Sequence, residues 1–362
     1  MVKIKNIEFY NFRNFKNFKT SFDDKLNILF GNNGCGKTNI LEGISLIAKG
    51  RGIRNSSIIN LIKKQEDKFL IKNNLEIQKD CFNIEIFTEQ KNEKFKKIIK
   101  INDDSSKDSL NFLNNSISFL IFLPEMERLF QASPAYRRNF LDRLIFSSRN
   151  DYNRLINKYK KSLLERNKIL QSDNIDDDWL NHIEAEISLL GLEIYNLRNS
   201  QINTLNDEIN NMKNDYNFLF DVKLEIKDRF LNNEINFEEY LLNLKKSRVY
   251  DKQFGGTKIG PHKSEIISTV NNEYEASLLS TGQQKTIVLM VLLAQCNHLV
   301  NHKKINPIFL FDEIGSHLDK NNRQILLDII DRFEIQFFLT GTDKKLFSFV
   351  STNAQFYNIT DV

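Results

Sequence analysis

Cysteine is scarce in this sequence, and long hydrophobic runs are absent. Only three of the 362 residues are cysteines (Cys35, Cys81 and Cys296), and no two of them form a Cys-x-x-Cys pair. This usage is typical of a reducing cytoplasm. The longest largely apolar run, Thr286–Cys296, is far shorter than the roughly 18–20 residues that cross a bilayer, and no signal or transit peptide is visible. We therefore expect a cytoplasmic protein without a membrane segment.

The net charge is also small, at +4 with a pI of about 8.7. Such a balance permits nucleic-acid binding without indicating it, and heavy use of lysine, isoleucine and asparagine is typical of AT-rich genomes. Local imbalance is more informative. Residues 1–60 carry ten Lys/Arg against four Asp/Glu, and Ser133–Lys168 carries ten against three, whereas Ser172–Glu186 is acidic.

The periodicity of apolar residues divides the chain into three parts. The first ~125 residues contain short alternating segments typical of strands, such as Ile4–Phe9, Leu26–Phe30 and Phe82–Phe87. From about Pro134 to Tyr216 the period is helical and predicts two helices of about 50 Å each, with a kink between Leu197 and Ile202 where the repeat jumps by five. These helices form either an antiparallel hairpin or part of an ordinary bundle.

The end of the chain has an alternating α/β pattern. Helix Gln284–Val300 precedes strand Pro307–Phe311, and helix Asn321–Phe333 precedes strand Ile335–Leu339. The simplest architecture is an α/β fold with a parallel sheet built from both chain ends. We expect residues 1–130 and 245–362 to form this head and residues 131–244 to form an inserted α-helical arm, a short antiparallel coiled coil.

A glycine-rich loop follows strand Leu26–Phe30 and opens the next helix. It fits the pattern G-x-x-x-x-G-K-[ST]. The glycines let backbone N–H groups point at phosphate oxygens, Lys37 can reach the β- and γ-phosphates, and Thr38 can hold Mg²⁺. The residues predicted to bind ATP here are Gly31, Asn32, Asn33, Gly34, Cys35, Gly36, Lys37, Thr38 and Asn39.

Two carboxylates end the buried-strand run Ile308–Phe311. Asp312 is placed to orient Mg²⁺ together with Thr38, and Glu313 is placed to polarise the attacking water. Asp312, Glu313 and Lys37 are therefore the predicted catalytic residues. Taken alone, the same run is also compatible with an ordinary strand followed by an acidic turn.

A third motif, Leu279–Lys285, precedes a long apolar helix, and Ser280 is placed as its N-cap. A serine, a glycine and exposed N–H groups at a helix N-terminus form a second phosphate-binding surface, which here comprises Ser280, Gly282 and Gln283. These residues resemble the ABC signature L-S-x-G-Q. The resemblance implies that ATP is sandwiched between two copies of the chain, and that Ser316–Asp319 forms the D-loop at that interface.

The order and spacing of the motifs favour the SMC-like branch of the ABC ATPases, because about 240 residues with a helical hairpin separate Thr38 from Ser280. Nearly the whole chain resembles the RecF family of bacterial recombination proteins. The resemblance rests on Asn11–Phe15, Gly31–Glu42, Gly50–Arg54, Ser133–Asp142, Gly260–Lys263 and Thr340–Asp343. The chain departs from the family at Pro124–Glu127, where many members have Pro-Glu-Asp-Leu and where we place the Q-loop. It has Thr342 and Asp343 where transporters have a histidine switch.

The resemblance implies an ATP-dependent DNA-binding protein of replication, repair and the SOS response. It would dimerise on ATP, clamp duplex DNA at junctions with single-stranded gaps, and help the RecO and RecR mediators to load RecA, with weak, DNA-stimulated ATP hydrolysis for release. The candidate phosphate contacts are Arg137, Arg138, Arg143, Arg149 and Arg154, although this cluster could also be a solvated helix face. Arg138 and Arg143 could instead serve the head. By family and position, Arg13 and either Arg51 or Arg54 are candidate nucleotide contacts.

Two alternatives remain at this level. One is an ABC ATPase subunit of a transporter or of a ribosome-associated complex, which the spacing and the inserted arm oppose. The other is a scaffold that binds ATP without turnover, which the carboxylate of Glu313 opposes.

Overall fold

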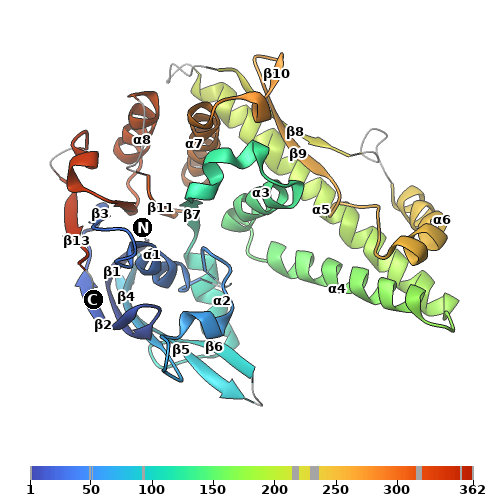
Figure 1. Cartoon of the computed structure of the whole chain (residues 1–362), viewed down its shortest axis with the longest axis horizontal. Coiled ribbons are helices and arrows are strands. Elements are labelled where there is room, and N and C mark those ends of the chain that lie inside the picture. Colours follow the sequence, from blue (N-terminus) through green and yellow to red (C-terminus); the bar gives the residue numbers. More distant parts are fainter. Residues whose placement is uncertain are drawn as a thin grey trace. The chain divides into compact units, whose positions relative to one another are not determined.

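The computed structural model describes residues 2–48, 50, 52–91, 94–213, 220–228, 236–314, 320–350 and 353–360 (Figure 1). The chain divides into two compact units. Unit 1 comprises Met1–Glu127 and Val288–Val362, and unit 2 comprises Arg128–Ile287. Residues 245–287, which the sequence analysis assigned to the head, thus belong to unit 2. The reason is that they contribute a helix and two strands that pack and pair within that unit.

Unit 1 contains a five-stranded parallel sheet in the order β13-β3-β12-β11-β7. The strands are β3 (Leu26–Phe30), β7 (Phe119–Phe122), β11 (Ile308–Phe311), β12 (Phe337–Gly341) and β13 (Gln355–Asn358). The predicted parallel sheet built from both chain ends is confirmed. Its central strands are buried along their whole length, as strands covered on both faces must be. Strand β13 was not predicted, because its four residues are too few to show an alternating pattern.

A second sheet of unit 1 is antiparallel, in the order β2-β1-β4-β5-β6. Its strands are β1 (Val2–Phe12), β2 (Phe15–Ser21), β4 (Leu70–Ile77), β5 (Asp80–Lys91) and β6 (Lys94–Ile101). The helices of this unit are α1 (Lys37–Ser45), α2 (Lys107–Ser116) and α8 (Lys320–Arg332). Helix α7 (Thr281–Asn297) begins in unit 2 and ends in unit 1.

Unit 2 contains the helices α3 (Pro134–Ser148), α4 (Tyr152–Gln171), α5 (Asp177–Met212) and α6 (Phe237–Phe254). A small antiparallel sheet joins β8 (Val222–Lys227), β9 (Glu265–Val270) and β10 (Tyr274–Glu275). Helices α4 and α5 form the predicted antiparallel hairpin, since Arg166 pairs with Glu184 whereas Lys158 pairs with Glu186. The first predicted helix is in fact two, because residues 149–151 separate α3 from α4.

The predicted kink between Leu197 and Ile202 is wrong, because α5 is helical without interruption from Asp177 to Met212. The apolar repeat skips a turn there since polar side chains take the buried positions. Arg198 is only 3% exposed and binds both carboxylate oxygens of Asp142 at 2.9 Å. The buried face of α5 therefore continues between Leu197 and Ile202, and the charge of Arg198 is neutralised by Asp142.

The family-like segment Gly260–Lys263 lies in the core of unit 2. Gly260 has φ +124°, and a Cβ there would lie 2.1 Å from the hydroxyl oxygen of Tyr240, so no other residue fits. The Nδ1 atom of His262 lies 2.8 Å from the hydroxyl of Tyr159, and its Nε2 lies 2.8 Å from the carbonyl oxygen of Thr257. Burial lowers the pKa of His262 to about 4. This motif is therefore structural in unit 2.

No helix in the described ranges is long and apolar enough to cross a membrane. All three cysteines are free thiols, two of them buried.

Candidate nucleotide-binding site

The glycine-rich loop lies between strand β3 and helix α1, as predicted, and its glycines are required by its shape. Gly34 and Gly36 have φ +87° and +108°, which side chains rarely adopt. A Cβ on Gly36 would lie 2.5 Å from the ring of Phe15, and one on Gly31 would lie 2.2 Å from the carbonyl oxygen of Ile359. Nothing lies within 4 Å of the corresponding point at Gly34, so its backbone borders open space. The loop is therefore a cradle fixed at both ends and open at its middle.

Lys37 lies at the centre of this cradle. Its side chain is 4% exposed, and its Nζ donates to the carbonyl oxygens of Gly31 at 2.7 Å and Asn32 at 2.8 Å. The loop thus curls around the ammonium group. This position suits a cation that neutralises terminal phosphate oxygens, and the loop N–H groups with the N-terminus of α1 complete an anion-binding surface.

Thr38 and Asp312 meet at the edge of the parallel sheet. The Thr38 hydroxyl donates to Asp312 Oδ1 at 2.9 Å, and the Thr340 hydroxyl donates to the same oxygen at 2.8 Å. Asp312 is 4% exposed, and this burial raises the pKa of its carboxyl group above the ordinary value. A hydroxyl oxygen and a carboxylate oxygen at the foot of the phosphate loop are the donor set that suits Mg²⁺, which keeps further water and phosphate ligands.

Glu313 is exposed and directly follows Asp312. Its backbone has φ +52°, an unusual left-handed conformation for glutamate, and its N–H donates to the Thr340 hydroxyl at 2.7 Å. Thr340 therefore joins the two carboxylate residues, because its hydroxyl donates to Asp312 and accepts from Glu313. From the sequence, Thr340 was identified only as part of the family-like segment Thr340–Asp343. A lone hydroxyl ending the apolar run Phe337–Leu339 was the signal available for it.

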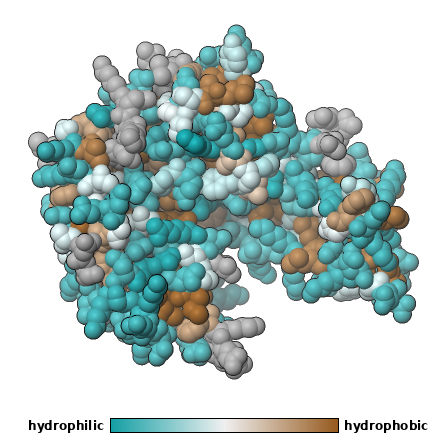
Figure 2. Space-filling view, in the orientation of Figure 1, coloured by the Kyte–Doolittle hydropathy of each residue, from teal (hydrophilic) through white to brown (hydrophobic). Residues whose placement is uncertain are grey.

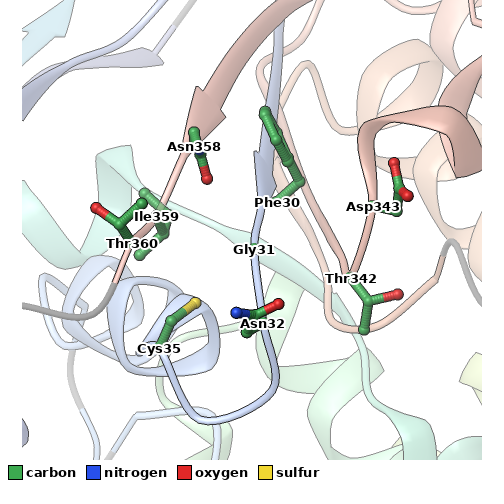
Figure 3. A pocket seen from close by; sticks show the side chains of 9 residues that line it. All are labelled: Phe30, Gly31, Asn32, Cys35, Thr342, Asp343, Asn358, Ile359 and Thr360. Carbon is green, nitrogen blue, oxygen red and sulfur yellow. The ribbon is translucent and has the colours of Figure 1, made fainter.

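A pocket of about 360 Å³ adjoins the first residues of the loop (Figure 3). It is lined by Phe30, Gly31, Asn32, Cys35, Thr342, Asp343, Asn358, Ile359 and Thr360. In Figure 3 the side chain of Asn32 lies between those of Cys35 and Thr342. Thr342 and Asp343, predicted to lie where transporters have a histidine switch, thus line the same pocket as Asn32, the loop residue next to Gly31.

Arg13 and Asn14 form hydrogen bonds to the phosphate loop and to helix α1. The Arg13 guanidinium binds both carboxylate oxygens of Glu42 at 2.7 and 2.8 Å, and Glu42 is fully buried on α1. Asn14 donates to the carbonyl oxygen of Cys35 at 3.2 Å and accepts from Asn39 at 2.8 Å. Arg13 was predicted as a nucleotide contact, but its donors are engaged by the protein, and we assign it to positioning α1.

The other residues and loops predicted to contact nucleotide lie at different distances from the phosphate loop or outside the described residues. Arg54 Nη1 donates to the Asn39 side chain at 3.0 Å, which places it beside the end of the loop. Arg51 lies outside the described residues, as does the predicted D-loop Ser316–Asp319. The predicted Q-loop, Pro124–Glu127, begins two residues after the end of β7, the strand that pairs with β11.

Lys97 is a further residue that the sequence did not reveal. Its Nζ donates to the carbonyl oxygens of Leu46, Ala48 and Gly50 at 2.8–3.1 Å, beyond the C-terminal end of α1. A cation there is favourable for the helix dipole and fixes the helix that carries Thr38. Burial lowers the pKa of Lys97 to about 8. Only the fold brings β6 to this helix end, so no local pattern could have indicated it.

In unit 2, the Leu279–Lys285 motif caps helix α7. The Ser280 hydroxyl accepts from the Gln283 N–H at 3.3 Å, and the Gln283 side chain accepts from the Ser280 N–H at 3.0 Å. This reciprocal pair is a capping box, so the prediction that Ser280 is the N-cap is confirmed. Ser280 is exposed and Gly282 is half-buried, which leaves the helix N-terminus open to an anion.

Comparison with known proteins decides the family. Residues 3–361 match the family described as RecF/RecN/SMC N terminal domain. The chain is 33% identical over 354 residues to the DNA replication and repair protein RecF of Rickettsia conorii, with 97% of this chain and 96% of that protein covered. The chain belongs to the RecF family. The RecF protein of Rickettsia prowazekii is 35% identical over 344 residues, with 94% of each chain covered.

Solved structures agree with membership of the RecF family. The structure of the recombination mediator protein RecF-ATP in the RecFOR pathway has a TM-score of 0.81 at 26% identity and covers 95% of this chain and 92% of that one. The corresponding RecF-ATPrS structure has a TM-score of 0.85 at 26% identity, with 99% and 96% covered. An Smc head bound to part of ScpA, at 17% identity and a TM-score of 0.54 with 95% and 90% covered, shares the fold. The predicted ABC-type head with an inserted helical arm is confirmed, and the transporter and ribosome alternative has no support.

The arginines predicted to contact DNA have unequal surroundings in this RecF-family chain. Arg137 is 8% exposed, donates to the carbonyl oxygen of Ala132 and pairs with Glu265. Arg138 is half-buried and donates to the carbonyl oxygen of Ser264 at 2.6 Å, and Arg143 is half-buried in α3. Arg137 and Arg138 therefore have hydrogen-bond partners within unit 2. Arg149 is exposed but pairs with Asp151 at 2.8 Å. Arg154 is exposed on α4.

Proposed function

We propose that this chain is an ATP-switched DNA clamp of the RecF kind. Two copies bind ATP and Mg²⁺ between them and hold duplex DNA beside a single-stranded gap. With RecO and RecR they promote RecA loading, and slow hydrolysis releases the DNA. The three free thiols fit a cytoplasmic protein. Family membership and the RecF-ATP relative support this proposal.

The observation that carries the proposal is the convergence of the Thr38 and Thr340 hydroxyls on one carboxylate oxygen of Asp312 beside the phosphate loop. A scaffold that only held ATP would not require a buried metal-binding carboxylate followed by an exposed glutamate. Bound Mg²⁺ would supply charge neutralisation at the phosphates. The chain's own residues do the rest. Lys37 neutralises terminal oxygens, Thr38 and Asp312 hold the metal, and Glu313 orients and polarises water.

The capped N-terminus of α7 supplies the other half of the site. We propose that Ser280, Gly282 and Gln283 of one copy close over the ATP held by Gly31–Thr38 of a second copy. Hydrolysis is then slow in dilute protein, because two copies must meet before either site is complete. DNA that holds two copies together accelerates it by raising their effective concentration.

The proposal is tested by DNA binding with and without ATP, comparing duplex, single strand and gapped duplex across a salt series. We expect ATP to strengthen binding to duplex and gapped DNA, with a steep decline as salt rises. Affinity that is independent of ATP and has a shallow salt slope would overturn the clamp.

The Glu313→Gln variant provides a second readout. It keeps nucleotide binding but removes the group that polarises water, so it should elute as a dimer from a sizing column in ATP and as a monomer without it. A monomer under both conditions would count against ATP-driven dimerisation.

A further inference from the structure

The two helices of the arm hairpin differ in charge. Helix α4 has 20 residues with one acidic residue, Glu165, and six basic residues: Arg154, Lys158, Lys160, Lys161, Arg166 and Lys168. Helix α5 has 36 residues with a single basic one, Arg198, which is buried. A lysine excess that came only from genome composition would affect both helices. The basic character is therefore a feature of α4 itself.

The exposed basic residues of α4 lie along one face. Arg154, Lys158, Lys161 and Lys168, here called the basic stripe, are spaced by four, three and seven residues and are all exposed. At 1.5 Å per residue they span about 21 Å. Two carboxylates face them. Glu165 lies on the same side of α4, and Glu186 of α5 pairs with Lys158 at 2.7 Å. In Figures 1 and 2 the edge of unit 2 along which α4 runs is mainly hydrophilic.

The buried basic residue of α4 has a different role. Arg166 is fully buried and pairs with Glu184 of α5 at 3.0 Å and with Asp251 of α6 at 2.7 Å. It ties the three helices together and leaves the stripe on a rigid element. A straight row of cations about 21 Å long on a rigid helix matches about six base pairs of duplex, whose phosphates repeat every ~3.4 Å along each strand.

We propose that the basic stripe of α4 binds the phosphate backbone of double-stranded DNA, an inference that rests on the proposed function. The aromatic residues of α4, Tyr152 and Tyr159, are 1% and 2% exposed, so α4 offers no platform on which single-stranded bases stack. The stripe does not resemble a protein-binding surface, because protein interfaces are poor in lysine and have an apolar centre. Leu164 is the one large apolar side chain exposed on α4. Cations without stacking groups contact phosphates and read no bases.

Helix α6 provides a matched control. It exposes Lys245, Lys246 and Lys252, but these alternate with exposed apolar residues, namely Leu242, Val249, Tyr250 and Phe254. Replacing three lysines on either helix changes the net charge of the same unit by the same amount. A general electrostatic effect would therefore weaken DNA binding equally in both variants. A binding site on α4 would weaken it only in the α4 variant.

The test compares full-length wild type with Lys158→Gln/Lys161→Gln/Lys168→Gln and with Lys245→Gln/Lys246→Gln/Lys252→Gln. Binding of a fluorescent blunt duplex is measured with ATP between about 50 and 200 mM salt. Three lost phosphate contacts should lower the slope of log K against log salt by about 2.7 and weaken binding at least tenfold at ~100 mM. The α6 variant should remain within about threefold of wild type, and all three proteins should bind ATP equally.

The outcomes separate this inference from the proposed function. Wild type that binds duplex while the α4 variant matches it in slope and affinity would overturn the stripe alone. Equal losses in the α4 and α6 variants would overturn it as well, as would a loss confined to single-stranded DNA. Wild type that fails to bind DNA with ATP would overturn the proposed function itself.

Discussion

The Thr38 hydroxyl lies 2.9 Å from Asp312 Oδ1, although 274 positions separate the two residues in the sequence. The contact joins the end of the phosphate loop to the end of strand β11. It exists because β3 and β11 both pair with β12 in a parallel sheet, which brings their carboxyl ends to one edge.

Asp312→Asn should separate metal binding from nucleotide binding. Asparagine has the size of aspartate and lacks its charge, so binding of ATP without Mg²⁺ should persist, whereas strengthening by Mg²⁺ should disappear. Hydrolysis should fall about 100-fold or more, since the metal neutralises developing charge. Titration of ATP with and without Mg²⁺ measures both effects. Asp331→Asn, at an exposed position on α8, is the control and should behave as wild type.

Asp312→Asn should stabilise the metal-free protein against unfolding, although it impairs hydrolysis. A raised pKa means that the native state holds the proton of Asp312 more tightly than the unfolded state does. The ionised group therefore lowers the free energy of unfolding above its ordinary pKa of 3.8, and this loss is complete above the raised value. Asp312→Asn should raise Tm at pH 7 without metal, and the difference should vanish as the pH falls below 3.8. A lower Tm at pH 7 would contradict it.

Thr340→Val should impair hydrolysis more than binding. Valine keeps the shape of threonine but removes the hydroxyl that accepts from the Glu313 N–H. This hydrogen bond helps to hold Glu313 at φ +52°. We expect kcat to fall about tenfold to a hundredfold with little change in KM for ATP, because Thr340 acts through Asp312 and Glu313. Thr340→Ser should restore most of kcat. A Ser variant as impaired as the Val variant would show that packing of the methyl group, and not the hydroxyl, matters.

His262 should make unit 2 sensitive to acid. Its pKa is lowered to about 4 in the folded protein, from 6.5, because burial disfavours the charged form. Below about pH 6.5 the unfolded chain therefore binds a proton at His262 that the native state does not bind. The free energy of unfolding falls as the pH drops toward 4, by up to about 3 kcal/mol. In urea titrations between pH 7 and 4, His262→Asn should weaken this dependence. His182→Asn, at an exposed site on α5, should not.

The sequence predicted those parts of the fold and site that depend on local chemistry. The phosphate loop, the strand ending at Asp312 and the cap at Ser280 each occupy consecutive residues whose types follow from their roles. Strand β3 was predicted at its observed bounds for the same reason. Contacts made by distant residues were not predictable. Thr340 and Lys97 become important only once β12 and β6 are placed beside the loop and α1.

Buried polar residues account for the main errors. Arg198 occupies a core position of α5, so the apolar repeat has a gap that resembles a kink. Arg137 was predicted as a DNA contact, and in the structure it is buried in unit 2, where it pairs with Glu265 and donates to the carbonyl oxygens of Phe130 and Ala132. A charged side chain can be either a surface ligand or a paired core residue, and only the three-dimensional partner distinguishes the two.

The central claim is that each ATP is held by two copies of the chain, and mixing two inactive variants tests it most directly. Lys37→Met disables the phosphate loop, and Ser280→Arg blocks the capped end of α7. A mixed dimer contains one site built from two intact halves, so the mixture should recover ATP hydrolysis that neither variant shows alone. At equal amounts, random pairing should give about one quarter of wild-type activity. No recovery at any ratio would contradict the shared site.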